Sequence, residues 1–239
     1  MSFITEGFLA SIPVLSADEA AVVREQFNDL EARVGRETAQ IGLLDRHHDE
    51  PFIAALARHP KVLEAVEGAL GPDFFLLATH FFCKYGEGEA ASTFVAWHQD
   101  VTYWGLEPAT AVTVWLAIDD ADEENGCMRV IPGSHVAGIR EHATAQQAGN
   151  LLSINQEVPV TQDEEASAVN LPLKAGFASL HEGCLIHGSL PNRSMRRRCG
   201  LTLRYVPTEV KQSTTNSRGK RWHPTLVRGI DRYRHWTEE

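Results

Sequence analysis

The amino-acid sequence predicts a mainly β protein with a helical layer at its N-terminal end. Up to about residue 70, apolar residues recur every three or four positions, which is typical of amphipathic helices. From residue 74 onward the apolar runs are short, rich in aromatic and β-branched residues, and separated by turn residues, as in antiparallel sheets. We therefore expect one domain over 1–239, with a helical layer over about 16–70, a β core over about 74–206 and a C-terminal segment over 207–239.

The expected helices have recognisable ends. Ser16 and Glu19 have the spacing of a capping box, in which each side chain accepts a hydrogen bond from the main chain of the other residue, so a helix begins after Ser16. Its apolar face is formed by Ala20, Val23, Phe27, Leu30 and Val34. Shorter helices are expected over 52–58 and 61–70, and Gly71-Pro72 ends the last one.

Seven segments after residue 73 have the composition of strands. They cover 74–85, 94–97, 110–118, 127–131, 177–180, 184–187 and 199–206. Asn125-Gly126 and Pro132-Gly133-Ser134 are typical of tight turns. The polar stretch 136–170 has no sustained period, so we expect a long loop with some helix, a kind of segment that is often functional.

Charge and composition exclude several classes of partner. The formal net charge of −10 argues against a nucleic-acid partner, which calls for a basic face. No apolar run approaches the roughly 20 residues of a membrane helix, and the first residues lack the features of a signal peptide. The four cysteines form no CxxC pair, and free thiols in a reducing cytoplasm are expected. We therefore expect a cytoplasmic monomer or homodimer with a small-molecule partner.

The sequence His98-Gln99-Asp100 is a candidate metal-binding motif. Side chains two apart on a strand project to the same face, so His98 and Asp100 can bind one metal. With a second histidine they would form a site that leaves three coordination positions open, which suits non-haem Fe(II) and oxygen chemistry. Such a pair is common by chance, and the alternative is a histidine and an aspartate on an edge strand that face water.

His187 is the favoured second histidine because it ends an apolar run beside a glycine turn. His181 competes with it, since the two residues are six apart and share strand parity. Arg198 begins the following strand, and if the two strands pair as a hairpin, His187 and Arg198 lie close together. A buried arginine needs an anionic partner. A dicarboxylate cosubstrate would supply one carboxylate to Arg198 and chelate the metal with its other end.

Other polar clusters favour structural interpretations. The segment 47–50, with two histidines and two acids, is expected to be a solvated loop, and His80 a core histidine. The acidic run 119–124 is expected to be a solvated loop. The turn arginines expected to face solvent are Arg193, Arg196 and Arg197. Arg204 has the strand parity of Arg198, so it either contacts the cosubstrate or substrate or forms a surface salt bridge.

Several of these segments together resemble the phytanoyl-CoA dioxygenase family. The resemblance is carried by 94–104 (FVAWHQDVTYW), 114–119 (VWLAID), 124–135 (ENGCMRVIPGSH), His187-Gly188-Ser189 with 191–194 and Arg198, and 227–233 (VRGIDRY). It covers roughly residue 8 to the end of the chain. The order and spacing of the motifs are specific enough to make chance a poor explanation.

The resemblance implies a double-stranded β-helix, which is a jelly-roll fold like that of the cupins. It implies Fe(II) as cofactor, with 2-oxoglutarate and O2 as cosubstrates. The implied iron ligands are His98, Asp100 and His187. The implied 2-oxoglutarate site comprises Arg198, which holds the distal carboxylate, together with Ser189 and Trp115.

The resemblance further implies that Trp104 lines the substrate pocket, with Tyr103 and Gln99 as further pocket residues and Arg204 as a possible contact. The expected reaction is hydroxylation of an unactivated C–H bond of a small metabolite, with release of succinate and CO2. Desaturation, epoxidation or cyclisation at the same iron is the alternative, and a metal-binding β-barrel without turnover is a remote one. Related halogenating enzymes have a small residue in place of the metal-binding carboxylate, so Asp100 favours oxidation over halogenation.

Overall fold

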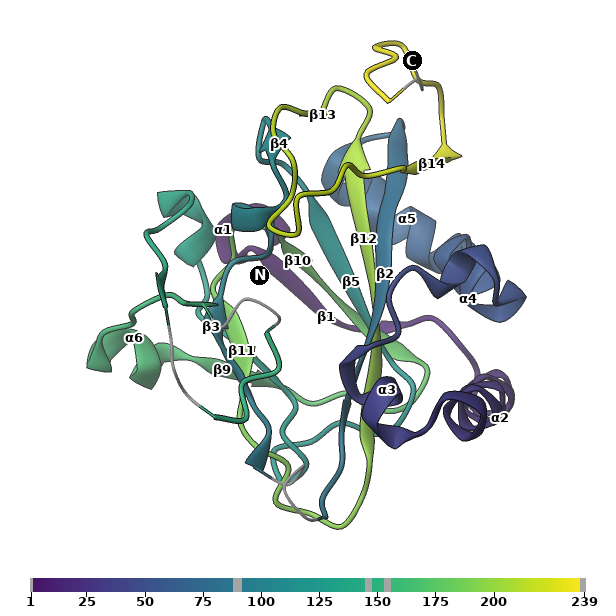
Figure 1. The fold of residues 1–239 in the computed structure, drawn as a ribbon. Coiled ribbons are helices and arrows are strands. Elements are labelled where there is room, and N and C mark those ends of the chain that lie inside the picture. The colour runs from purple at the N-terminus through teal and green to yellow at the C-terminus, as the bar shows by residue number, and fades with distance from the viewer. Residues whose placement is uncertain (1, 88–91, 145–147, 153–155, 237–239) are drawn as a thin grey trace.

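Two antiparallel sheets face each other in the computed structural model, which describes residues 2–87, 92–144, 148–152 and 156–236 (Figure 1). The larger sheet has the order β1-β10-β5-β12-β2-β14 and the smaller has the order β3-β11-β6-β9. The larger sheet contains β1 (Phe8–Pro13), β10 (Phe177–Glu182), β5 (Val112–Ala117), β12 (Arg198–Pro207), β2 (Phe74–Lys84) and β14 (Thr225–Arg228). The smaller contains β3 (Val95–His98), β11 (His187–Ser189), β6 (Met128–Val130) and β9 (Val169–Leu171). This is the predicted double-stranded β-helix.

Two short two-stranded sheets extend the fold. One pairs β4 (Leu106–Glu107) with β13 (Lys211–Gln212), and the other pairs β7 (Ala143–Thr144) with β8 (Gln156–Glu157). The predicted long loop over 136–170 therefore contains short strands, the 3-10 helix η4 (Ser134–Ala137) at its start and the helix α6 (Gln162–Ser167). The element α1 (Phe3–Glu6) and the edge strand β1 were not predicted.

The remaining helices cover the outer face of the larger sheet (Figure 1). They are α2 (Ala17–Val34), α3 (Arg36–Ile41), α4 (Pro51–Ala57) and α5 (Pro60–Leu70), with the 3-10 helix η1 (Arg46–His48) between α3 and α4. The predicted capping box is present: Ser16 N–H donates to Glu19 at 2.8 Å, and Glu19 N–H donates to Ser16 Oγ at 3.3 Å. Phe27 of α2 is fully buried and packs on Phe81 of β2 with ring centroids 4.8 Å apart. This packing anchors the helical layer, and burial of one such ring contributes about 1.5–3 kcal/mol.

The apolar run 184–187 does not form the predicted strand. The chain turns after β10, where Leu185 N–H donates to Glu182 O and Cys184 N–H donates to the Glu182 carboxylate. Ile186 is fully buried against Ile131 and Val158. A buried turn and a buried strand both require apolar residues, so composition did not separate them. The strand begins only at the last residue of the run and continues as β11.

The strands of His187 and Arg198 do not pair as the hairpin that the sequence left open. β11 pairs with β3 and β6 in the smaller sheet, whereas β12 pairs with β2 and β5 in the larger one. The connecting segment 190–197 crosses between the sheets and is held by the Asn192 side chain, which donates to the carbonyls of Lys84 and Arg196. The two strands therefore face each other across the interior.

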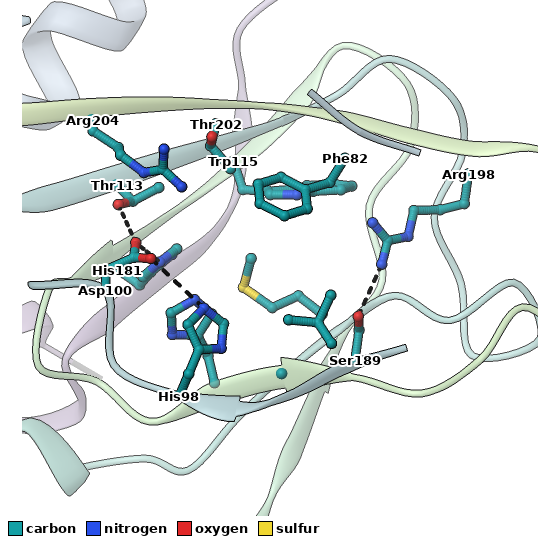
Figure 2. Close-up of a pocket in the computed structure, with 14 residues that line it drawn as sticks. Phe82, His98, Asp100, Thr113, Trp115, His181, Ser189, Arg198, Thr202 and Arg204 are labelled. Carbon is teal, nitrogen blue, oxygen red and sulfur yellow. Dashed lines mark hydrogen bonds and ion pairs between the residues drawn. The ribbon is translucent and has the colours of Figure 1, made fainter. Parts of the chain in front are cut away.

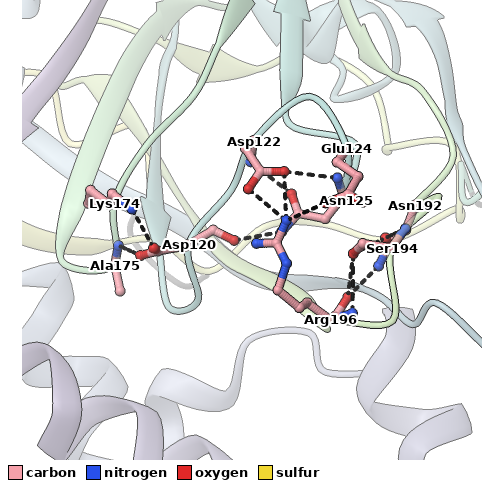
Figure 3. A network of polar contacts seen from close by, with 9 residues as sticks. All are labelled: Asp120, Asp122, Glu124, Asn125, Lys174, Ala175, Asn192, Ser194 and Arg196. Atoms are coloured by element: carbon pink, nitrogen blue, oxygen red, sulfur yellow. Dashed lines mark hydrogen bonds and ion pairs between the residues drawn. The ribbon is translucent and has the colours of Figure 1, made fainter.

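This crossing segment also corrects the expectation for the acidic run (Figure 3). Arg196 pairs with Asp122 at 2.8 Å and with Glu124 at 3.0 Å, and Lys174 pairs with Asp120 at 2.8 Å. Arg197 makes a two-pronged contact with Asp119 at 2.7 and 3.0 Å and pairs with Glu31 at 3.1 Å. Arg197 and Asp119 are largely buried, with side-chain exposures of 17% and 13%, so the expectation of solvation is wrong for them. Arg196, Asp122 and Glu124 are exposed as expected and are in addition paired, because the fold brings the distant segment 190–197 onto this loop.

All four cysteines are free and buried, as predicted. Within the described ranges, the structure contains no helix that is both long and apolar enough to span a membrane.

Candidate active site

The predicted metal triad lies together in the cavity between the two sheets. His98 ends β3, Asp100 begins the 3-10 helix η3 (Asp100–Tyr103), and His187 begins β11. His98 and His187 are opposite each other in the pairing of β3 with β11. One candidate ligand atom from each of the three residues lies within 4.8 Å of the others. Two imidazoles and one carboxylate thus converge.

The main chain fixes both imidazole rings of this triad. Nδ1 of His98 lies 2.9 Å from the carbonyl oxygen of Ala96, and Nδ1 of His187 lies 2.9 Å from that of Leu185. A carbonyl only accepts hydrogen bonds, so each Nδ1 carries a proton and Nε2 is the ring nitrogen left to bind a metal. Burial, together with His98 and His181, holds the pKa of His187 well below its usual value. The rings are therefore prepared to bind a metal through Nε2.

Asp100 uses one carboxylate oxygen for the protein and keeps the other near a histidine. Thr113 Oγ1 donates to Oδ2 at 2.6 Å, whereas Oδ1 lies 3.7 Å from Nε2 of His98. Burial alone raises the pKa of Asp100, but contacts with His181 and His98 and the charge of Arg204 outweigh it, and the pKa lies well below the usual value. Asp100 is therefore an ionised carboxylate with one oxygen suited to a metal.

His181 lies beside the triad but outside this group of three ligand atoms. Its Nε2 is 3.4 Å from Asp100 Oδ2, and its ring packs on that of His187 with centroids 4.3 Å apart. The parity argument does not apply, because His181 belongs to β10 of the larger sheet and His187 to the smaller sheet. The geometry therefore favours His187 as the third ligand, with His181 packed behind the carboxylate.

Arg198 lies on the opposite side of the same cavity (Figure 2). Its Nε and Nη2 donate to the carbonyl of Gly126 at 3.0 and 2.7 Å, and Nη2 lies 3.1 Å from Ser189 Oγ. The residue is 3% exposed, and burial lowers its pKa to about 10, so the guanidinium is charged at neutral pH. None of the ion pairs found in the described ranges involves Arg198. Its charge calls for an anionic ligand.

Lys84, which the sequence analysis did not single out, joins this cationic end. It is fully buried at the end of β2 and lies opposite Arg198 in the pairing with β12. Its Nζ donates to Ser189 Oγ at 2.7 Å and to the carbonyl of Leu190. Burial and the charge of Arg198 hold the pKa of Lys84 well below its usual value. A lysine at the end of a strongly apolar strand was the signal that could have identified it.

Trp115 forms a wall of the cavity near Arg198. The guanidinium carbon of Arg198 lies 5.3 Å from the centre of its ring, and Trp115 is 4% exposed. A Cβ atom on Gly200 would lie 2.0 Å from Cζ2 of Trp115, so only glycine allows the indole to lie against β12. Gly200, a glycine inside an apolar strand, is the second residue that the sequence analysis missed at this site.

A second cavity of about 290 Å³ opens beside the triad and has aromatic walls. Trp104 packs edge to face on Trp222 with centroids 6.2 Å apart, and Trp222 Nε1–H donates to the Trp104 carbonyl at 2.9 Å. Tyr103 also lines it, and its buried hydroxyl has no hydrogen-bond partner among the described residues. Trp222 comes from the C-terminal segment and was not predicted. The structure thus brings the predicted pocket residues Tyr103 and Trp104 to one cavity.

Gln99 and Arg204 also lie along this second cavity, with different contacts. The Gln99 amide donates to the carbonyls of Gly138 and Cys184 at 2.8 and 2.6 Å and accepts from Arg140 N–H at 2.8 Å, so it is already engaged by the main chain. Arg204 is 9% exposed and packs over Trp104 at 5.2 Å. The alternative of a surface salt bridge is therefore wrong for Arg204.

The remaining histidine clusters lie outside the metal-ligand group, although His80 also lines the second cavity. His80 is 5% exposed and bonds the carbonyl of Ile41 at 2.6 Å, which confirms a core histidine. The segment 47–50 is less exposed to solvent than expected. His47 bonds Thr79 at 3.0 Å, and the buried Glu50 accepts from Arg33 at 2.8 Å. Among the described residues, His98, Asp100 and His187 form the one group with metal-ligand geometry.

The donor set and its surroundings fit ferrous iron. Two neutral imidazoles and one carboxylate that leave several positions open are the ligands of non-haem Fe(II) oxygenases. The rings are oriented by main-chain carbonyls and the carboxylate by Thr113, which is the outer support that metal ligands require.

The family model described as phytanoyl-CoA dioxygenase (PhyH) matches residues 4–200. The chain therefore belongs to the phytanoyl-CoA dioxygenase family, whose members are iron- and 2-oxoglutarate-dependent oxygenases.

Curated relatives agree with this placement. A phytanoyl-CoA dioxygenase domain-containing protein 1 homolog of Dictyostelium discoideum is 34% identical over 110 residues, which are 46% of this chain and 39% of that protein. L-proline trans-4-hydroxylase of Streptomyces griseoviridis is 30% identical over 175 residues, 66% of this chain and 64% of that protein. The chain thus matches less than two thirds of the length of these relatives.

Solved structures share the fold. A structure titled non-heme monooxygenase, ThoJ apo, is 29% identical with a TM-score of 0.76 and covers 96% of this chain and 83% of its own. The structure of EctD from S. alaskensis with 2-oxoglutarate and 5-hydroxyectoine is 21% identical with a TM-score of 0.67. The match covers 86% of this chain and 74% of the EctD chain. The second likeness is evidence for the fold alone.

Proposed function

We propose that this chain is an Fe(II)- and 2-oxoglutarate-dependent dioxygenase that hydroxylates an unactivated C–H bond of a small metabolite and releases succinate and CO2. One observation carries the proposal. A single cavity has a metal-ligand group on one side and, on the other, Arg198, a buried cation without an ion-pair partner, beside Ser189. A ligand that chelates a metal through one end and carries a carboxylate at the other fits both, and 2-oxoglutarate is such a ligand.

In this proposal His98, Asp100 and His187 hold the iron, which when bound supplies the oxygen chemistry that no side chain can perform. The carbonyls that fix the two rings keep Nε2 available as a ligand. Thr113 holds the carboxylate of Asp100 in place through Oδ2. Because Asp100 takes a coordination position itself, a halide has no place there, and the product is oxidised rather than halogenated.

Arg198 would hold the distal carboxylate of 2-oxoglutarate with its planar fork of donors. Its contact with the Gly126 carbonyl fixes the guanidinium before the cosubstrate arrives, which lowers the entropy lost on binding. Ser189 would donate its hydroxyl to the same carboxylate, and Lys84, which donates to Ser189 Oγ at 2.7 Å, would orient that hydroxyl. Trp115 would exclude water from the cosubstrate and stack on the guanidinium.

The substrate would lie in the second cavity against Trp104 and Tyr103, with Arg204 beside them. Its volume of about 290 Å³ is at the small end of ligand pockets and suits a metabolite of modest size. The 30% identity to a protein named L-proline trans-4-hydroxylase supports hydroxylation of such a molecule. The engaged amide of Gln99 gives it a supporting role, in which it holds the segment 138–140.

The test measures succinate formation with Fe(II) and 2-oxoglutarate, alone and with a metabolite extract. We expect succinate in equal amount to the 2-oxoglutarate consumed, dependence on iron, and loss of turnover in His187→Ala. His235→Ala is the matched control, because His235 is exposed and remote from the triad. Iron binding without succinate under all conditions would support the metal-binding barrel instead.

A further inference from the structure

Arg204 is a buried arginine with which no described side chain forms an ion pair or a hydrogen bond. It lies on β12 between β5 and β2 and is 9% exposed. Its Nε is buried and has no hydrogen-bond partner, and none of the ion pairs in the described ranges includes it. The guanidinium stacks over Trp104 at 5.2 Å. Burial of an unpaired charge is costly, so such a site is built to receive an anion.

The other buried or half-buried arginines show what Arg204 lacks. Arg197 grips Asp119 with two nitrogens at 2.7 and 3.0 Å, and Arg129 pairs with Glu165 at 2.8 Å. Arg198 donates to the Gly126 carbonyl and to Ser189. Arg204 has no comparable partner, although it is more buried than Arg197 and Arg129 and only somewhat less buried than Arg198.

Three anionic groups are already assigned to the site, and none of them is assigned to Arg204: the Asp100 carboxylate, the end of 2-oxoglutarate that would chelate the iron, and the distal carboxylate that would pair with Arg198. Asp100 interacts with Arg204 through its charge but forms no ion pair with it, because Thr113 donates to its Oδ2 and its Oδ1 would bind the proposed iron. The distal carboxylate of 2-oxoglutarate is assigned to Arg198, and Figure 2 shows Arg198 and Arg204 on opposite sides of the pocket, with Asp100 on the side of Arg204. Arg204 is therefore left for a further anion, separate from Asp100 and from 2-oxoglutarate.

The second cavity has the electrostatic character that such an anion needs. Its wall carries the cations Arg204, Arg218, Lys220 and Arg221 and the carboxylates Asp45 and Asp100. Asp45 is engaged, since its Oδ1 accepts from Thr79 N–H at 2.9 Å. The excess of cations stands out in a chain with a net charge of −10, and it would concentrate small anions at the opening.

We infer, on the basis of the proposed function, that the substrate is a small organic acid whose carboxylate or phosphate group pairs with the Arg204 guanidinium. Its apolar or ring-shaped body packs against Trp104 and Trp222. This arrangement anchors one end of the molecule at β12 and leaves the other to face the iron triad, so the position of the anion selects which C–H bond is oxidised.

The test measures binding without turnover, using protein loaded with Fe(II) and 2-oxoglutarate in the absence of oxygen. The probes are aliphatic, cyclic and aromatic monocarboxylates, each paired with its own primary amide, together with phenyl phosphate, and titration calorimetry measures their affinity. We expect at least one acid to bind more tightly than its amide by about 10- to 150-fold, the range for a charge-assisted hydrogen bond. Tighter binding of phenyl phosphate than of phenylacetate would identify the anion as a phosphate, and the reverse order a carboxylate.

Variants then assign the effect to this residue. Arg204→Gln should remove the preference for the acid and leave the affinity of the amide unchanged, and Arg204→Lys should retain part of it. Arg193→Gln is the matched control, because it removes the same charge from an exposed loop. Amides that bind as tightly as acids, or a panel in which no acid binds, would overturn the inference.

Two measurements distinguish failure of the anion site from misfolding of the variant and from failure of the proposed function. The comparison of acid with amide uses the unmodified protein, so it stands even if Arg204→Gln fails to fold. Binding of 2-oxoglutarate to the iron-loaded protein is measured in the same way, and its absence would refute the proposed function rather than the anion site. Addition of salt should weaken acids and not amides, because the cations of the opening are exposed and are screened within about 10 Å at 0.1 M salt.

Discussion

Replacement of Arg198 by lysine is the sharpest test of the cosubstrate site. The substitution keeps a positive charge but removes the planar fork that matches a carboxylate. It also removes the two hydrogen bonds to the Gly126 carbonyl, at 3.0 and 2.7 Å, that hold the guanidinium in place. The variant therefore keeps the charge at this position and loses only the geometry that matches a carboxylate.

The expected size of the effect follows from these contacts. A hydrogen bond to a charged group contributes about 1.5–3 kcal/mol, and each 1.4 kcal/mol is about tenfold in affinity. The dissociation constant of 2-oxoglutarate should therefore rise by about 10- to 150-fold in Arg198→Lys. Iron affinity should stay the same, because Arg198 lies on the far side of the cavity from the triad (Figure 2).

Anaerobic titration of iron-loaded protein with 2-oxoglutarate measures this constant directly, and a separate titration with Fe(II) alone measures iron affinity. Arg193→Lys serves as the control for a change of an exposed arginine. An Arg198→Lys protein that binds 2-oxoglutarate like the parent would refute the assignment. If Arg204→Lys weakened 2-oxoglutarate binding instead, the roles of the two arginines would be exchanged.

Three further predictions concern the triad and its surroundings. His187→Ala should abolish iron binding and turnover. His181→Ala should weaken iron affinity by only about 10- to 100-fold, because it removes a residue that contacts the ligands and not a ligand itself. Equal effects of the two variants would contradict the choice of His187 as third ligand. With excess chloride, mass spectrometry should find oxygen but no chlorine in the product, and a chlorinated product would show that Asp100 is not a ligand. Burial, followed by the charge of Arg204, lowers the pKa of His80 to about 3. Below about pH 6.5, His80 is therefore protonated in the unfolded chain but stays neutral in the folded chain down to about pH 3. The free energy of unfolding should fall by about 1.4 kcal/mol per pH unit across this range. Denaturant unfolding of His80→Gln, which keeps a donor toward Ile41, should show a flatter acid limb than the parent, and an unchanged limb would count against this explanation.

Local signals predicted much of the fold. The capping box at Ser16, the apolar face that contains Phe27 and the strand composition of 74–85 and 199–206 each depend on residues close in the sequence. Such signals fail where two structures need the same composition. The run 184–187 is apolar because its end is buried in a turn against Ile131 and Val158, and nothing local separates that turn from a strand.

The candidate triad could be proposed from the sequence because His98 and Asp100 are two residues apart and His187 sits beside a distinctive glycine turn. The motif also carried the resemblance from which the iron and 2-oxoglutarate were expected. These residues do not encode locally how His187 and Arg198 come to lie near the same cavity. The sequence left open a hairpin between their two strands. The segment 190–197 instead carries the chain from one sheet to the other.

The sequence by itself determined the helical layer, the β core, the motif residues and the acidic charge of the chain, because periodicity, capping and spacing act over a few residues. Only the tertiary structure decided which side chains meet across the two sheets. It placed the buried Lys84 beside Arg198 and packed the Trp115 indole against Gly200, where a Cβ atom would clash. It also brought Trp222 from the C-terminal segment onto Trp104. It also left Arg204 buried without a partner among the described residues. These contacts depend on pairings between strands far apart in the chain, which local sequence patterns do not specify.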